Sequence, residues 1–205
     1  MNRAIVSIAS VLGLIVLSSC ATTSLRGSWV DPTYTSGPFK KIMIVGVAQR
    51  EVMRKMFEGT FSTELQKHGV QGIPSGTFSP GTEQLDRDAI AAKLTELGCD
   101  GVLITRLIDT RTQTTYYPPT GYAVPTPYYG GYYGYYYGAY AAAYSPGYIE
   151  ETTIASIETN LYDTRTGNLV WTGLTDTEVY GDVKGQLDEL IGLLIGKMTV
   201  DKLIP

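Results

Sequence analysis

The sequence predicts a single α/β (α+β) domain with a mixed sheet, in which a β-hairpin and a C-terminal helix follow a β-α-β-α-β order. Strand and helix patterns alternate over residues 39–115 with short links, which favours βαβ units on one sheet. Hydrophobic residues make up 43% of the 205 residues and charged residues 18%. Chains that are disordered throughout are poorer in apolar residues, so this composition favours a folded core.

The first strand is predicted at residues 40–47, because the apolar run 42–47 suits a strand that is covered on both faces. A helix follows at about 51–68, where apolar residues recur with helical spacing. Gly69 can end this helix in the left-handed conformation. A short strand is then expected at 70–73.

The later elements are predicted from the same signals. A second helix ends at Gly98, and two strands rich in Thr, Ile, Val and aromatic residues are joined by a turn that contains Gly167. The predicted bounds are about 86–97 for this helix, 101–109, 151–162 and 169–179 for three strands, and about 183–203 for a last helix. Gly192 and Gly196 give the last helix a small-xxx-small pattern, which indicates close packing of the helix on the sheet.

Residues 1–19 have the features of a bacterial signal peptide. Arg3 precedes an uncharged, mostly apolar run that is too short for a comfortable membrane-spanning helix. Leu17-Ser18-Ser19-Cys20 resembles the lipobox, in which small residues admit the signal peptidase and the cysteine receives the lipid. We therefore predict lipidation at Cys20, with a covalent lipid there and no other cofactor. The alternative is an ordinary signal peptide followed by a coincidental cysteine.

Residues 20–38 are rich in Thr, Ser, Gly and Pro and are predicted to be a lipidated tether, with a short strand at 28–30. Trp29 is expected either to dock on the domain or to touch the membrane interface. Residues 39–205 then form the periplasmic domain. Ala21 occupies the position where enteric lipoproteins of the inner membrane carry aspartate, and this resemblance implies the outer membrane instead.

An insert at residues 116–148 has a different composition, with 13 of the 16 tyrosines, 6 glycines, 5 prolines and no charged residue. Three interpretations are open: a loosely packed loop, a tyrosine-based interaction surface, and a membrane hairpin. Neighbouring tyrosines would occupy both faces of a strand, which disfavours the hairpin. The candidate interaction residues are Tyr128, Tyr129, Tyr132, Tyr133, Tyr135, Tyr136 and Tyr137.

No catalytic, cofactor-binding or metal-binding residue is predicted. His68 is the only histidine and is expected at the C-terminal end of a helix, where a positive partial charge suits the helix dipole. Cys99 has no histidine placed to activate it and is expected to be a small buried residue. Glu150, Glu151 and Glu158 leave a hydrolase as an alternative, since a glycosidase needs two carboxylates beside a sugar cleft.

Four motifs resemble those of known proteins, namely Trp29-Val30-Asp31-Pro32 and residues 39–47, 98–103 and 161–171. After a lipobox, this set resembles uncharacterised Gram-negative outer-membrane lipoproteins. The order of the elements also resembles the periplasmic α/β domain that the N-terminal region of TolB shares with the curli secretion lipoprotein CsgG. The resemblance implies assembly or scaffolding in the envelope rather than catalysis.

The sequence therefore predicts a non-enzymatic, membrane-anchored lipoprotein that acts as a binding, scaffolding or assembly factor in the periplasm. The net charge of −4 argues against nucleic-acid binding, which needs a basic face. The expected partners are the membrane, through the lipid, and an envelope protein or glycan. The alternative is a subunit of an oligomeric, CsgG-like secretion or export complex.

Overall fold

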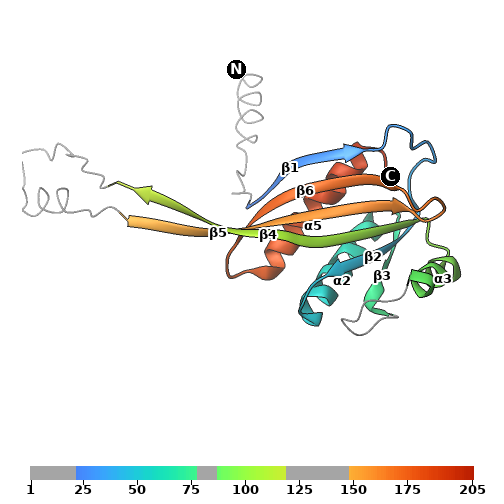
Figure 1. Ribbon diagram of the computed structural model, residues 1–205, viewed down its shortest axis with the longest axis horizontal. Helices are drawn as coiled ribbons and strands as arrows, with labels where there is room; N and C mark the ends of the chain where they lie inside the picture. Colours follow the sequence, from blue (N-terminus) through green and yellow to red (C-terminus); the bar gives the residue numbers. More distant parts are fainter. Residues whose placement is uncertain (1–21, 78–86, 119–147) are drawn as a thin grey trace, which may run out of the picture.

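The computed structural model describes residues 22–77, 87–118 and 148–205, which form one mixed six-stranded sheet with helices on both faces (Figure 1). The elements are β1 (Thr23–Val30), β2 (Lys41–Val47), α2 (Glu51–Lys67), β3 (Gln71–Pro74), η1 (Ser75–Thr77), α3 (Arg87–Leu97), β4 (Gly101–Tyr117), β5 (Tyr148–Asp163), β6 (Leu169–Val179) and α5 (Val183–Val200). The strand order is β1-β6-β5-β4-β2-β3, parallel among β4, β2 and β3 and antiparallel elsewhere. The predicted fold class is confirmed.

The main core lies between the sheet and the helices α2 and α5. Phe61 of α2 and Ile191 of α5 are completely buried there, together with Trp171 of β6. Helix α3 packs on the opposite face, where Leu94 and Leu97 contact a smaller apolar cluster on β2 and β4. Within the described residues, no helix covers this second face over β1, β6 and β5 (Figure 1).

The predicted glycine positions are confirmed at the ends of the elements. Gly69 after α2, Gly98 after α3 and Gly167 in the turn between β5 and β6 have φ angles of 75°, 64° and 72°. Each lies in the left-handed region that side chains with a Cβ disfavour. Helix α5 ends at Val200, three residues before the predicted end, where Lys202 takes a positive φ of 60°.

Glu58 connects α2 to the carboxyl ends of β2 and β3. Its Oε1 accepts hydrogen bonds from the backbone N–H of Gly46 at 3.0 Å and from the hydroxyl of Ser75 at 2.6 Å. Its Oε2 accepts the backbone N–H of Gly76 at 2.9 Å. A buried carboxylate is costly without such donors, so these three bonds let the side chain sit at 1% exposure and hold α2 in place.

Part of the predicted tether is a strand. The structure extends the expected strand at 28–30 back to Thr23, and β1 pairs with β6 as an edge strand, with one irregularity between Leu25 and Gly27. The polar sequence of residues 23–28 carries little apolar signal, so propensity alone did not reveal the pairing. The described sheet therefore includes a strand on the N-terminal side of residue 39.

Strands β4 and β5 are longer than predicted. They pair continuously to Tyr117 and Tyr148, with one irregularity between Leu107 and Asp109. Tyr116, Tyr117 and Tyr148, which were expected in the insert, therefore lie in strands. Figure 1 shows these two strands continuing beyond the rest of the sheet.

The last pair between β5 and β6 joins Thr153 to Val179. Beyond it, residues 113–117 and 148–152 form five pairs with each other and with no third strand in the described part of the chain. We call these ten residues the arm; at about 3.3 Å per residue it extends roughly 17 Å past β6. The neighbouring residues 107–112 and 153–157 are its base.

The two glycines of α5 do not pack on the sheet, so that prediction was wrong. A Cβ placed on Gly192 or Gly196 would meet no atom within 4 Å, and both residues are exposed. The helix instead presents Ile191, Leu194 and Ile195 to the core. The small-xxx-small spacing reflects the outer side of an amphipathic helix rather than a close contact.

Candidate functional site

Few of the predicted site residues fall within the described structure. Cys20 and the signal peptide lie outside the described residues, as do the seven candidate tyrosines between 128 and 137. Tyr116, Tyr117 and Tyr148 are the tyrosines of the same segment that the structure places, and all three lie at the outer end of the arm. The candidate site is therefore built on the arm and on the end of the sheet that carries it.

The outer end of the arm is apolar on both faces. Tyr117 and Tyr148 are register partners, and their rings stack with centroids 4.8 Å apart. Tyr116 and Ile149 form the next pair, on the opposite face, and are 62% and 64% exposed. Exposed aromatic pairs of this kind offer a large contact area at low entropic cost.

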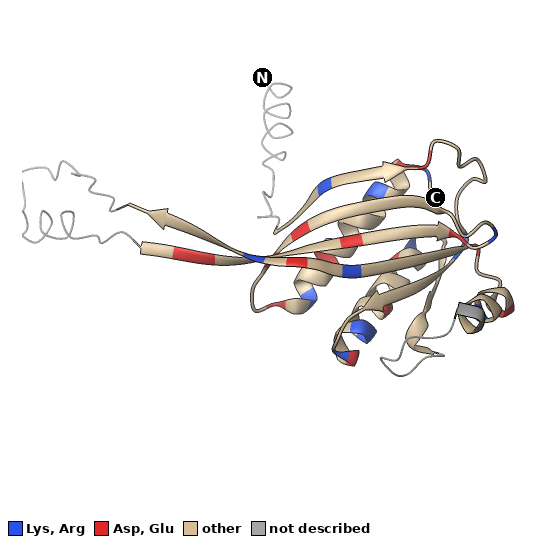
Figure 2. Ribbon diagram, in the orientation of Figure 1, with Lys and Arg blue, Asp and Glu red and all other residues tan. Residues whose placement is uncertain are grey.

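Charge begins one residue further in along the arm. Glu150 and Glu151 are neighbours on β5 and point to opposite faces, while the outermost residues carry no charge (Figure 2). A hydrogen bond with Glu150 raises the pKa of Tyr117, since the charged acceptor favours the protonated phenol. The arm thus carries aromatic residues at its outer end and two glutamates next to them.

A polar cluster fixes the base of the arm to the rest of the sheet. Arg111 of β4 pairs with Asp176 of β6, and its other guanidinium nitrogen donates to the hydroxyl of Ser156 at 3.0 Å. Ser156 donates in turn to Asp176 at 2.6 Å, and Arg26 of β1 lies 3.6 Å from the same carboxylate. Four strands therefore contribute to one network on the face that no described helix covers there.

The electrostatics of this network favour an ionised Asp176. Burial by itself raises the pKa of this carboxyl, but hydrogen bonds from Arg111 and Ser156 outweigh it, and the pKa lies below its ordinary value. Arg106 and Glu158 form a second ion pair across β4 and β5 at 2.8 Å. These contacts orient the arm rather than create a reactive group.

The N-terminal end of β1 is held at the same end of the sheet. The backbone N–H of Thr22 donates to Glu189 of α5 at 2.7 Å, and the Thr22 hydroxyl donates to the other carboxylate oxygen at 2.5 Å. The N–H of Thr23 adds a third bond to Glu189 at 3.1 Å. Burial raises the pKa of Glu189, but these hydrogen bonds outweigh it and lower the pKa overall.

Apolar residues surround this end of the sheet. Val179 ends β6, Tyr180 follows it and Val183 begins α5, and these residues are 46%, 52% and 38% exposed. The Tyr180 hydroxyl lies 3.4 Å from the hydroxyl of Thr22. We call Val179, Tyr180 and Val183 the end patch.

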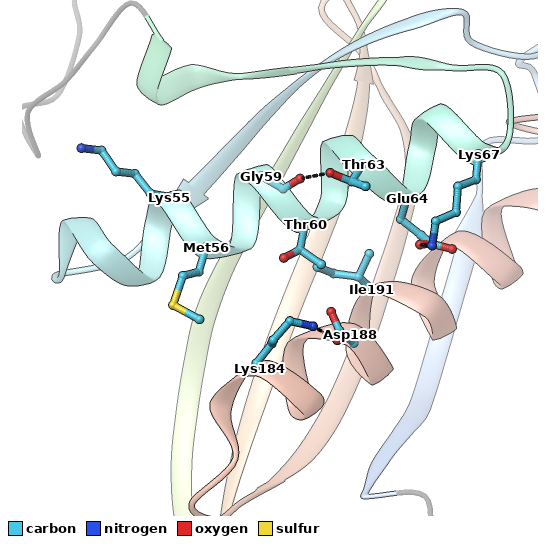
Figure 3. A pocket seen from close by; sticks show the side chains of 10 residues that line it. All are labelled: Lys55, Met56, Gly59, Thr60, Thr63, Glu64, Lys67, Lys184, Asp188 and Ile191. Atoms are coloured by element: carbon cyan, nitrogen blue, oxygen red, sulfur yellow. Dashed lines mark hydrogen bonds and ion pairs between the residues drawn. The ribbon is translucent and has the colours of Figure 1, made fainter.

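A groove of about 660 Å³ lies between α2 and α5, the two helices that cover the same face of the sheet (Figure 3). Thr60 and Ile191 lie where the two helices face each other, and the charged residues line the rim. Its lysines are already paired with carboxylates of their own helices: Lys55 with Glu51, Lys67 with Glu64 and Lys184 with Asp188. The groove therefore presents paired charges rather than a built site for an ionic ligand.

The histidine, the cysteine and the glutamates that the sequence analysis considered for catalysis lie apart from one another. His68 is the C-cap of α2, as predicted, and Cys99 is a buried free thiol whose pKa burial raises. Glu150 and Glu158 share a face of β5 but are eight residues apart, about 26 Å along the strand. Those two carboxylates cannot flank one glycosidic bond.

Two further surveys cover only the described residues. They contain no group of three or more His, Cys, Asp or Glu side chains that could hold a metal ion. In the same part of the chain, no helix combines the length and the apolar character needed to cross a membrane.

Comparison with solved structures finds distant similarity. Two crystal forms of a PelC dodecamer from Paraburkholderia phytofirmans align with TM-scores of 0.45 and 0.43 at 10% and 11% identity, covering 84% and 85% of this chain and 95% and 94% of theirs. Lipoprotein GNA1162 from Neisseria meningitidis aligns with a TM-score of 0.41 at 15% identity, over 78% of this chain and 99% of that chain. No known protein family and no curated protein matches the sequence.

Sequence reasoning missed the residues that build this end of the molecule. Asp176 alternates with buried Thr175 and Thr177, which signals a solvent-facing position on β6. Nothing in the local sequence indicates that Arg111, 65 residues away, is its partner. Glu189 gave no signal either, because its partner Thr22 is 167 residues away.

Proposed function

We propose that this protein is a non-catalytic lipoprotein of the bacterial outer membrane, anchored through Cys20, whose periplasmic domain binds an envelope partner with its arm. The single observation that supports this most is the arm itself. Two strands leave the sheet as a pair, carry exposed aromatic residues at their end, and are oriented by the network around Asp176. The sequence also resembles the TolB N-terminal and CsgG-like domain, and that resemblance implies the same kind of role, in assembly or scaffolding in the envelope.

The physics of an isolated hairpin supports a binding role. A two-stranded hairpin alone is marginally stable in water, because it buries little apolar surface. An exposed edge strand is also a liability that proteins usually cover. A chain that keeps both features, and fixes their direction with Arg111 and Asp176, is best explained by a partner that covers them.

A protein partner suits the arm better than a glycan. Beyond Arg106, β4 pairs with β5 alone among the described strands, so its other edge presents backbone N–H and C=O groups. Such an edge can accept an extended segment by strand addition, with the aromatic residues contacting alternate side chains. A glycan that stacks on Tyr116 or Tyr148 is the alternative.

Two trimmed variants test the proposal by in-cell crosslinking and partner capture. One replaces residues 118–147 by Asn-Gly and leaves the Tyr117–Tyr148 pair to close the arm. The other replaces residues 113–152 by Asn-Gly and closes the strands at the Thr112–Thr153 pair. Asn-Gly forms the tight turn that joins directly paired strands.

We expect the first variant to keep its partners and the second to lose them. Loss in both would move the binding role to the tyrosine-rich insert. Partners that persist in both variants would contradict the proposal. Circular dichroism and urea unfolding of the purified variants show whether the domain stays folded.

A second candidate function is a subunit of an oligomeric envelope complex, favoured by the same free edge of β4, which a copy of the chain can also cover. Size measurement of the lipidated protein in detergent distinguishes the two. A species of several subunits that the second trimmed variant loses favours the complex. A monomer at all concentrations counts against it.

A further inference from the structure

The first described residues, Thr22 and Thr23, are held tightly by the folded domain. Thr22 is held by Glu189 through its backbone N–H and its hydroxyl, and its carbonyl oxygen accepts the N–H of Glu178 at 2.9 Å. Thr23 is buried and shares a contact between hydroxyls with Thr177 at 3.1 Å. The first described residues are therefore pinned by contacts from both β6 and α5.

Cys20 precedes Thr22 by two residues. Two residues of fully extended chain span at most about 7 Å. A lipid on Cys20 would thus hold Thr22 within a short distance of the lipid headgroups, whatever path the two residues take. This separation is much shorter than the tether that the composition of residues 20–38 predicted.

We infer that the end of the domain formed by Thr22 and the end patch lies directly against the membrane surface, with Val179, Tyr180 and Val183 in contact with the lipid headgroup region. The inference rests on the proposed lipidation of Cys20. The occupant of the patch is the bilayer in which that lipid is inserted.

The chemistry of the end patch suits an interface. Tyrosine is enriched at the headgroup level, because its ring is apolar and its hydroxyl remains hydrated. Tyr180 is half exposed although its hydroxyl lies beside Thr22, and two half-exposed valines flank it. No other function described above accounts for this exposed apolar group beside the first described residues.

The charges around the patch exclude attraction to anionic lipids as the cause. Glu178 and Asp182 are exposed beside it, and Lys184 is already paired with Asp188. An acidic rim gains nothing from a negative surface. The contact is therefore expected with zwitterionic lipids and should depend little on salt.

The same end of the sheet carries the base of the arm. Val179 of the patch pairs with Thr153, and Thr23 pairs with Thr177 on the same strand. The short attachment therefore fixes the height of the arm's base above the membrane as well as that of the patch. A partner would therefore bind the arm close to the bilayer surface.

Depth-dependent fluorescence quenching tests this orientation. The lipidated protein with Cys99→Ala is reconstituted into phosphatidylethanolamine and phosphatidylcholine vesicles that carry a headgroup-attached nitroxide. An environment-sensitive dye is placed on Val183→Cys or, as the matched control, on Val200→Cys. These valines are the first and last residues of α5, about 26 Å apart along the helix, and both are exposed.

We expect the nitroxide to quench the dye at position 183 several-fold more than the dye at position 200. Equal quenching at both positions, or stronger quenching at 200, would overturn the inference. A second variant carries 15 Gly and Ser residues between Ala21 and Thr22. The longer linker should lower the quenching at 183 several-fold, and unchanged quenching would overturn the role of the short attachment.

Acyl labelling of the same preparations separates this inference from the proposed function. A labelled protein that shows no quenching at 183 contradicts the membrane contact alone. Absence of acyl label would overturn the anchoring on which both depend. Loss of partners from the trimmed variants concerns the arm and has no bearing on the end patch.

Discussion

Arg111 and Asp176 form an ion pair across β5, although their own strands, β4 and β6, are not neighbours in the sheet. Ser156 of β5 lies between them, accepts a hydrogen bond from Arg111 and donates one to Asp176. The three side chains join the base of the arm to the body of the sheet on a face that no described helix covers there. The direction of the arm is thus set by side chains as well as by the backbone ladder.

Because Asp176 is ionised in the folded state, the free energy of unfolding should decrease at acidic pH. Its folded pKa lies below the ordinary value of 3.8, so the folded state keeps the carboxylate charged where the unfolded state begins to bind a proton. The stabilisation is present above about pH 4 and is lost as pH falls through the folded pKa. Urea unfolding at several pH values should show a smaller acid-side decline for Asp176→Asn than for the natural chain. Identical declines would contradict this assignment.

Removing the Glu58 carboxylate should destabilise the domain. Glu58→Ala leaves the N–H groups of Gly46 and Gly76 and the hydroxyl of Ser75 without their acceptor. Breaking such a buried charged network costs about 3 kcal/mol, measured by chemical denaturation. The control is Glu64→Ala on the same helix, whose ion pair with Lys67 is at the surface and should change stability by less than about 0.5 kcal/mol. Equal effects at the two positions would count against a special role for Glu58.

Two glycine-to-alanine substitutions should have opposite effects. A Cβ on Gly173 would lie 2.5 Å from the buried ring of Trp171, whereas a Cβ on Gly192 would meet nothing within 4 Å. We expect Gly173→Ala to destabilise the fold by about 1–3 kcal/mol through overpacking. Gly192→Ala should stabilise it by roughly 0.5–1 kcal/mol, because alanine is the better helix former. Thermal unfolding of both variants measures the difference, and a destabilised Gly192→Ala would show that this face of α5 is covered.

Substitution of Cys20 tests the lipobox directly. Cys20→Ser should abolish acyl labelling and block removal of the signal peptide, because serine offers no thiol for the lipid. Labelling with a fatty acid probe and the apparent mass in cells measure both effects. Normal processing of a Cys20→Ser protein into an unlipidated form would refute the lipobox.

Glu189 should protect the start of β1 from opening. Glu189→Ala removes the acceptor for the N–H groups of Thr22 and Thr23, so hydrogen exchange at these two amides should accelerate at least tenfold. Asp188→Ala is the matched control. Asp188 is the residue next to Glu189, but its carboxylate pairs with Lys184 at the surface. Exchange at Thr22 that is unaffected by Glu189→Ala would contradict the pinned N-terminus.

Local patterns predicted most of the elements because the relevant signals lie within a few residues. The apolar run 42–47 became a strand covered on both faces, and the helix expected at 51–68 is α2 with a glycine end at Gly69. The lengths of β4 and β5 were underestimated, because residues 110–115 are all threonine, arginine or glutamine. Polar strands of that kind are stabilised by their pairing partner and give little periodic signal alone.

The sequence by itself determined the fold class, the order of the elements and the glycine turns, because each depends on local periodicity or on a φ angle that one residue sets. Only the tertiary structure decided that β1 belongs to the sheet, that Asp176 meets Arg111, and that Thr22 is held by Glu189. These contacts join residues that are far apart along the chain, so they follow from strand order and register. For that physical reason, residues 23–30 of the predicted tether form an edge strand, and the two ends of the insert, 116–117 and 148, belong to the paired strands of the arm.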